Sequence, residues 1–249
     1  MGLMTFKGGV HPFEGKDLSK DKPIRELLPK GELVYPLSQH IGAPATPIVA
    51  VGDSVLKGQK IAEAGGFVSA PIHASVSGTV KKIEPRRVPT GDMVNSIVIE
   101  SDGEFKEVEY QAVEDVSALS KEEIINRIKE AGVVGMGGAG FPTHVKLSPK
   151  EPEKIDYIIA NCAECEPYLT SDYRIMLDHT EELVEGMRII LSMFEHAKGV
   201  FAVENNKPDC IAKLLELTKD EPRMEVVPLM TKYPQGGERF LIKAVTDRE

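Results

Sequence analysis

The chain has 249 residues, 41% hydrophobic and 28% charged, so it is long enough to bury one large core or two modest ones. Its formal net charge of −9 argues against non-specific binding to nucleic acid or to anionic lipid. No stretch approaches about 18 uninterrupted apolar positions, so we expect no direct membrane span. Three cysteines are too few for a disulfide framework, which is typical of a reducing, cytosolic compartment.

Residues 1–33 are polar and rich in Lys, Gly and Pro, and they show no sustained periodicity. We interpret them as an extended N-terminal arm. The arm either wraps a neighbouring part of the protein or forms a surface tail, and the composition does not distinguish the two.

Residues 34–115 contain short apolar runs closed by turn residues, such as "PIVAVGDSV", "SGTVKKIE" and "NSIVIESDG". Runs of this kind predict the strands of a compact all-β domain. The stretches "VGDSVLKGQKIAE" and "APIHASVSGTVKKIE" resemble the barrel-sandwich hybrid of biotinyl and lipoyl carrier domains. Those carriers present a modifiable Lys at a hairpin tip, but the corresponding residues 63–71 contain none. We therefore predict the fold without the swinging-arm function.

Residues 116–249 show a different pattern, in which helical and strand-like segments alternate. A capping box, Ser120 with Glu123, opens a helical pattern that Gly132 ends. Strand-like runs then alternate with helical patterns, at residues 155–161, about 179–196, 199–205, 208–219 and 224–229. This alternation predicts parallel strands joined by right-handed crossovers, with ligands beyond the carboxyl ends of the strands.

The predicted fold class is therefore α/β. A β-rich, barrel-sandwich-hybrid-like domain over residues 34–115 precedes a Rossmann-like, three-layer α/β domain over residues 116–249. We expect this second domain to be incomplete at its C-terminus, as in the N-terminal portion of a longer protein.

The stretch "GVVGMGGAGFPTHVK", residues 132–146, contains a G-x-G-x-x-G at Gly135, Gly137 and Gly140. A dinucleotide fingerprint follows a strand and opens a helix, whereas these glycines follow a helix, so we reject the ordinary Rossmann assignment. Glycines this dense predict a tight loop whose bare backbone approaches a flat ring or a phosphate. Lys146 could add a cation.

Three blocks carry a family resemblance. The glycine stretch resembles the flavin loop of the NADH-binding subunit of respiratory complex I, "NCAECEP" at 161–167 is similar to its N-A-D-E-S-E-P block, and "YPQGGE" at 233–238 is similar to its Y-x-x-G-E-E turn. The start "GGVHPFEGKDLSKDKPI" and the wording "AECEPYLTSDYR" narrow the resemblance to the C subunits of Rnf-type electron transport complexes. It runs along essentially the whole chain.

The resemblance implies FMN as the cofactor and NAD(H) as the substrate. The residues implied around FMN are Gly135, Gly137, Gly138, Gly140, Lys146, Asn161, Glu164, Tyr233, Gly236 and Glu238. Phe141 and Glu166 would contact the nicotinamide nucleotide. The cofactor supplies the hydride chemistry, so we expect no catalytic side chain and no metal ligand here.

The implied function is that of the flavin- and NADH-binding portion of an oxidoreductase that couples ferredoxin and NAD to ion transport. Other subunits of the Rnf-type complex would hold it peripherally on the cytoplasmic face of the membrane, with ferredoxin as an indirect partner. The family continues with two runs of cluster-binding cysteines, so we expect iron–sulfur clusters only in a longer protein. This fragment alone should not complete the turnover.

Three positions depart from the family. Ala163 replaces an Asp of the acidic block, Met136 stands where an Arg is often found, and residues 147–149 replace an aromatic that stacks on adenine. Two alternatives stay open: a soluble flavin reductase such as the cobalamin reductase of microcompartments, and a non-catalytic scaffold like the A subunit of the sodium-pumping quinone reductase. The intact glycine loop and Lys146 favour the flavin-binding interpretation.

Cys162 and Cys165 form a C-x-x-C, a pattern found in redox dithiols and in zinc sites. A dithiol favours a helix N-terminus and a zinc site needs two more ligands, and the sequence predicts neither. We therefore expect these residues to fill a loop of the active site. His73 and His144 are isolated, and we expect hydrogen-bonded loop residues rather than metal ligands.

Overall fold

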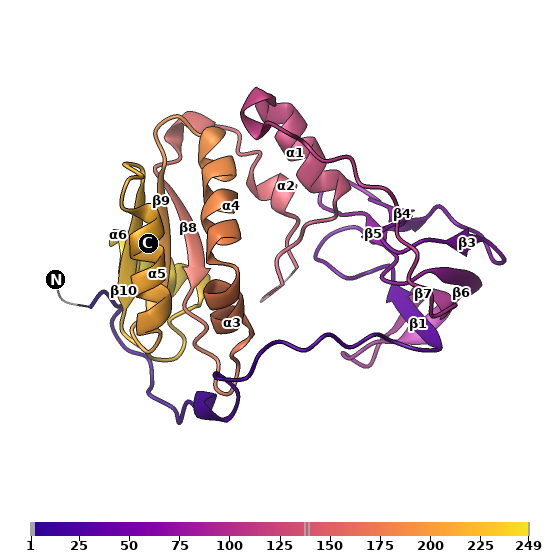
Figure 1. Ribbon diagram of the computed structural model, residues 1–249, viewed down its shortest axis with the longest axis horizontal. Coiled ribbons are helices and arrows are strands. Elements are labelled where there is room, and N and C mark those ends of the chain that lie inside the picture. Colours follow the sequence, from indigo (N-terminus) through magenta and orange to yellow (C-terminus); the bar gives the residue numbers. More distant parts are fainter. Residues whose placement is uncertain (1–2, 137, 139, 249) are drawn as a thin grey trace. The chain divides into compact units, whose positions relative to one another are not determined.

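The computed structural model describes residues 3–136, 138 and 140–248 (Figure 1). The chain forms two compact units: Leu27–Lys150 is one, and the residues up to Glu26 together with those from Glu151 onward form the other. In sequence, the first of these units is inserted into the second. The boundaries between these compact units fall at 26/27 and 150/151. The domain boundaries at 33/34 and 115/116 stay a prediction from the sequence.

The unit Leu27–Lys150 contains two sheets, whose strand orders are β1-β7-β6-β3 and β2-β4-β5 (Figure 1). The strands are β1 Glu32–Pro36, β2 Thr46–Pro47, β3 Ser54–Val55, β4 Lys60–Glu63, β5 Ile72–His73, β6 Gly78–Arg87 and β7 Met93–Ser101. All pair antiparallel, and side chains such as Ile61, Val80 and Ile97 are fully buried between them. The prediction of a strand-rich unit before the α/β layer is confirmed.

Two helices, α1 Lys121–Glu130 and α2 Thr143–Lys146, and the 3-10 turn η2 Val116–Ala118 also belong to this unit. The predicted capping box is formed, because Ser120 and Glu123 each bond the other's backbone N–H. Glu130 pairs with Lys60 of β4 at 2.6 Å, and a Cβ on Gly132 would lie 2.7 Å from the carbonyl oxygen of Pro71. These contacts explain why residues 116–150 group with the β sheets.

The other unit holds a parallel sheet in the order β10-β9-β8. Its elements are η1 Lys16–Leu18, η3 Pro152–Lys154, β8 Tyr157–Cys162, α3 Ser171–Asp178, α4 Thr180–Ser192, β9 Lys198–Glu204, α5 Pro208–Thr218, β10 Met224–Leu229 and α6 Glu238–Thr246. The three strands and the helices α4 and α5 lie where the sequence predicts them. The sequence analysis did not predict α3 or α6.

Helices cover both faces of this sheet. On one face, Gly199 of β9 lies against Met187 and Leu191 of α4, so close that a Cβ would be 2.8 Å from the Met187 sulfur. On the other face, Val200 and Ala202 pack with the buried residues of α6. Successive strand residues point to opposite faces, so β9 is buried on both sides. The predicted three-layer α/β architecture is confirmed.

The N-terminal segment lies along the α/β unit beside β10 (Figure 1). Met4 O accepts a hydrogen bond from Met230 N at 2.9 Å, and Val10 and Tyr233 exchange two backbone hydrogen bonds at 2.8 Å. The buried Phe6 ring stacks on Phe240 with centroids 4.5 Å apart. Residues 3–26 of the arm therefore lie against a neighbouring part of the protein.

Within the described part of the chain, no helix is both long enough and apolar enough to cross a membrane.

Candidate functional site

The predicted site residues are divided between the two units. Gly135, Gly138, Gly140, Phe141 and Lys146 lie in Leu27–Lys150, whereas Asn161, Glu164, Glu166, Tyr233, Gly236 and Glu238 lie in the α/β unit. Gly137 falls outside the described residues. We call residues 132–142 the glycine loop, and we call Asn161, Cys165, Tyr233 and Gly236 the strand-end cluster.

The glycine loop is closed at its base by backbone hydrogen bonds. Gly135 N donates to Phe141 O at 2.9 Å, and Thr143 N donates to Val133 O at 3.0 Å. Gly140 has a φ of 63°, in the left-handed region, and a Cβ there would lie 3.0 Å from the Gln39 carbonyl oxygen. Both the conformation and the close approach therefore require glycine at position 140.

A hollow of about 890 Å³ opens over this loop, lined by residues 39–41 and by described residues between Gly132 and Gly140. Cofactor sites have volumes of roughly 300–1,000 Å³. The space where a Gly138 Cβ would stand is open, and the Met136 side chain is 96% exposed. The hollow is open to solvent and presents bare backbone, which leaves room for a flat ligand to approach.

Lys146 and Phe141 are neighbours on the C-terminal side of the loop. The Lys146 ammonium lies 6.0 Å from the centroid of the Phe141 ring, the outer limit of a cation–π contact. Lys146 is exposed at the end of α2. The structure thus brings together, beside the glycines, the cation and the aromatic ring that the sequence analysis assigned to the cofactor and the nucleotide.

The strand-end cluster joins the other two sequence blocks at the carboxyl edge of the parallel sheet. Asn161, near the end of β8, donates from Nδ2 to Gly236 O at 2.8 Å, and Gly236 N donates to Cys165 Sγ at 3.2 Å. Tyr233 is 38% exposed after β10, and Glu238 opens α6. Parallel sheets bind ligands at this edge, so the cluster is placed where the topology predicts a site.

Ala163 departs from the family pattern, and its packing supplies a reason. It is fully buried and belongs to the apolar cluster with Val200, Leu229 and Leu241. A carboxylate at this position would be taken into a fully buried site that these apolar side chains line, which is costly. In this chain Ala163 is therefore a residue of the hydrophobic core.

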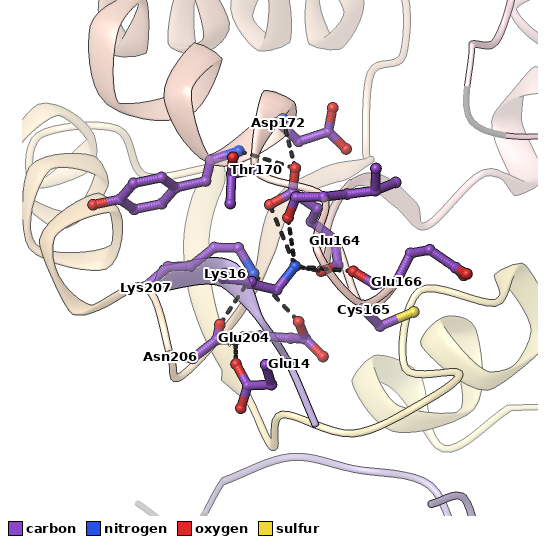
Figure 2. Close-up of polar contacts among 12 residues, drawn as sticks. Glu14, Lys16, Glu164, Cys165, Glu166, Thr170, Asp172, Glu204, Asn206 and Lys207 are labelled. Carbon is purple, nitrogen blue, oxygen red and sulfur yellow. Dashed lines mark hydrogen bonds and ion pairs between the residues drawn. The ribbon is translucent and has the colours of Figure 1, made fainter. Parts of the chain in front are cut away.

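Glu164 and Glu166 lie in different surroundings, as their alternation predicts (Figure 2). The Glu164 side chain is 2% exposed; its Oε1 accepts from Asp172 N at 2.7 Å in the first turn of α3, and its Oε2 lies 3.8 Å from Lys16 Nζ. Burial raises the pKa of Glu164, and the Asp172 N–H and the Lys16 ammonium oppose that rise. Glu166 is exposed. Of the two, Glu166 is the carboxylate open to an arriving ligand.

Four buried charges at this edge were missed by the sequence analysis: Lys16, Glu204, Lys207 and Lys232. Glu204 ends β9, and its fully buried carboxylate pairs with Lys207 at 3.3 Å. Burial raises the pKa of Glu204, while Lys207 acts in the opposite direction. The one available signal was the position of Glu204 directly after a buried parallel strand, where polar residues approach the ligand edge.

The C-x-x-C pair is not arranged for thiolate chemistry. Burial raises the pKa of Cys162 to about 12 and also raises that of Cys165, whereas reactive thiolates need a lowered pKa. Among the residues that the structure describes, no group of three or more His, Cys, Asp or Glu side chains could hold a metal ion. His73 and His144 lie in β5 and α2 and not in loops, and burial lowers the pKa of both.

We expect Cys162 to resist a thiol reagent in the folded protein. With a pKa of about 12, its thiolate fraction at pH 8 is on the order of 1 in 10,000, and the side chain is buried. Labelling with dithionitrobenzoate at pH 8, followed by peptide mass analysis, should show rapid modification of Cys162 only after denaturation. Rapid labelling of Cys162 in the native protein would contradict the packing role.

Comparison with known proteins addresses both units. Residues 4–104 match the family model described as the RnfC barrel sandwich hybrid domain, and residues 128–249 match the model described as the Nuo51 FMN-binding domain. The chain is 45% identical over 249 residues to the C subunit of the Na(+)-translocating ferredoxin:NAD(+) oxidoreductase complex of Acetobacterium woodii, covering 98% of this chain and 56% of that protein. The chain is therefore similar, over nearly its whole length, to C subunits of Rnf-type complexes. The predicted resemblance is thereby confirmed.

A second similar protein, the C subunit of the proton-translocating ferredoxin:NAD(+) oxidoreductase complex of Clostridium ljungdahlii, is 45% identical over 249 residues, which cover 99% of this chain and 54% of that protein. This chain thus spans about half the length of these curated relatives. A chain of an NAD+-reducing NiFe hydrogenase, solved in the H2-reduced state, is similar with a TM-score of 0.42 at 24% identity over 51% of this chain and 24% of that one, a likeness too partial to carry an argument.

Proposed function

We propose that this chain is the FMN- and NAD(H)-binding portion of an ion-translocating ferredoxin:NAD oxidoreductase. The observation that carries the proposal is the glycine loop, whose bare backbone borders a hollow of about 890 Å³. The match of residues 128–249 to an FMN-binding family gives the class of ligand, and the relatives' names give the reaction.

The residues proposed to hold FMN retain the sequence assignment except for Glu164. Gly135, Gly137, Gly138 and Gly140 supply the bare backbone, Lys146 supplies a cation, and Asn161, Tyr233, Gly236 and Glu238 supply the remaining contacts. The Glu164 side chain is buried against Lys16 and the first turn of α3, so its contribution is to support the loop and not to touch the flavin directly. Phe141 and Glu166 orient the nicotinamide nucleotide. Bound FMN would supply the hydride-accepting chemistry, while the protein's part is to bind, to orient and to exclude water.

The proposed setting is a peripheral one, on the cytoplasmic face of a membrane complex. Both relatives are named as C subunits of ion-translocating complexes, which supports other subunits of that complex as partners. Ferredoxin, which the names of both relatives' complexes include, is proposed as an indirect partner. The net charge of −9 fits attachment through protein partners better than attachment through anionic lipid.

The test is a fluorescence titration of FMN with this protein and with two variants. We expect saturable quenching at micromolar protein, and a dissociation constant at least about tenfold higher for Gly138→Val, because the added side chain fills space that is open to the ligand. Gly186→Ala in α4, also with open space around the new Cβ, is the control and should bind FMN like the parent.

Thermal unfolding accompanies each titration, so that a folded variant without affinity is told from an unfolded one. A folded parent that quenches no FMN contradicts the proposed function for this chain. Equal affinity of the parent and Gly138→Val would place the flavin away from the glycine loop.

A further inference from the structure

The N-terminal segment Glu14–Ser19 is hydrogen-bonded to residues 164–170 of the loop that follows β8 (Figure 2). We call this set of hydrogen bonds the grip of the segment on the loop. At its centre, Lys16 Nζ donates to the backbone oxygens of Glu164 at 2.8 Å, Glu166 at 3.1 Å and Leu169 at 2.6 Å. An ammonium group has three N–H donors, so one loop uses the whole donor capacity of this side chain.

Bonds on both sides of Lys16 reach the same loop. Tyr168 N donates to Glu14 O at 2.7 Å, and the Ser19 and Thr170 hydroxyls are hydrogen-bonded at 2.9 Å. Tyr168 has a φ of 68°, which is uncommon for an aromatic residue and is kept only where the surroundings hold it. The segment thus fixes the backbone of the loop at several points.

The loop depends on this grip, because residues 163–170 form no helix or strand that could pair their carbonyl groups. Backbone carbonyls turned inward need a partner, and Lys16 is that partner for Glu164. Lys16 is itself only 9% exposed, and a buried ammonium is costly unless it is paired. Glu164 at 3.8 Å supplies the opposite charge.

We propose that Lys16 is a positioning residue of the nucleotide site: with its segment Glu14–Ser19, it holds loop 164–170 in the shape that presents Glu166 and the strand-end cluster to flavin and nicotinamide nucleotide. The identity of the ligands, flavin and nicotinamide nucleotide, rests on the proposed function. The fixing of the loop rests only on the contacts of Lys16. The N-terminal arm therefore supports the binding site through the loop to which it is hydrogen-bonded.

The experiment compares the parent with Lys16→Met, Lys16→Arg and Lys213→Met. Lys213 is the matched control, because its Nζ also donates to a backbone carbonyl, that of Leu177 at 3.0 Å, but outside the loop. Two readouts are taken: backbone amide exchange, measured without any cofactor, and FMN affinity by fluorescence quenching.

For Lys16→Met we expect the amides of Tyr168 and Asp172 to exchange at least about tenfold faster, while the amide of Phe201 in β9 keeps its protection in the same sample. The FMN dissociation constant should rise on the order of tenfold. Lys16→Arg keeps the charge, but its larger planar guanidinium does not reproduce the three hydrogen bonds of the ammonium, so its affinity should lie between those of the parent and Lys16→Met. Lys213→Met should match the parent in both readouts.

If the Tyr168 and Asp172 amides of Lys16→Met exchange at the parent's rate, Lys16 does not fix the loop. If they exchange faster but FMN affinity is unchanged, Lys16 has no positioning role. If the parent binds no FMN, the proposed function fails, and the exchange readout still decides the grip. If Lys16→Met loses the Phe201 protection as well, Ser19→Ala takes its place, because it leaves every buried charge intact. It must speed exchange at Tyr168 and weaken FMN binding, and parent-like behaviour overturns the proposal.

Discussion

Replacing Lys207 with methionine should lower the free energy of unfolding by about 3–5 kcal/mol. The substitution leaves the Glu204 carboxylate, fully buried at the end of β9, without the ammonium that lies 3.3 Å from it. A buried charge without its partner carries most of its desolvation cost. Urea unfolding of the parent and the variant at pH 8 measures the loss.

The same loss should be smaller at pH 5. Lys207 lowers the pKa of Glu204 against the effect of burial, so its removal raises the folded-state pKa further. A carboxyl whose folded pKa is raised contributes stability that is complete below its unfolded pKa and is lost as the pH rises through the folded pKa. The variant should therefore recover part of its deficit on acidification. The double variant Glu204→Gln, Lys207→Met is the control and should lose this pH dependence, whereas an equal deficit of Lys207→Met at pH 5 and pH 8 would contradict the account.

Gly140→Ala should cost about 2–4 kcal/mol of stability, from the left-handed conformation and from overpacking together. The glycine has a φ of 63°, and the new Cβ would lie 3.0 Å from the backbone of both Gln39 and His40. Gly138→Ala, two positions earlier, is the matched control, because its Cβ would meet open space. We expect that control to stay within about 0.5 kcal/mol of the parent.

Denaturant unfolding of the two alanine variants is the measurement. A deficit in Gly140→Ala alone would establish that the loop is pressed against residues 39–40. Similar stabilities of both variants would mean that the loop is free of that neighbour, and that its glycines serve only the ligand.

The sequence by itself determined the elements whose signal is local. The runs that became β8, β9 and β10 are short and largely apolar, and β9 between the other two strands is buried on both faces. Such runs are visible without a structure. The capping box of Ser120 and Glu123 is equally local. The three sequence blocks sufficed to predict the resemblance to RnfC proteins, because each needs unusual residues at fixed spacing.

Tertiary structure decided what local pattern does not encode. Residues 116–150 joined the β unit through single contacts such as Lys60 with Glu130, which periodicity does not reveal. The arm has no period, because backbone hydrogen bonds hold it beside β10 and carry no side-chain signature. Lys16 resembles any surface lysine in the sequence, because the Glu164 carbonyl oxygen that accepts its hydrogen bond lies 148 positions away. The burial of a charge is set by partners from distant parts of the chain, so only the folded structure could place Lys16, Glu204 and Lys207 inside.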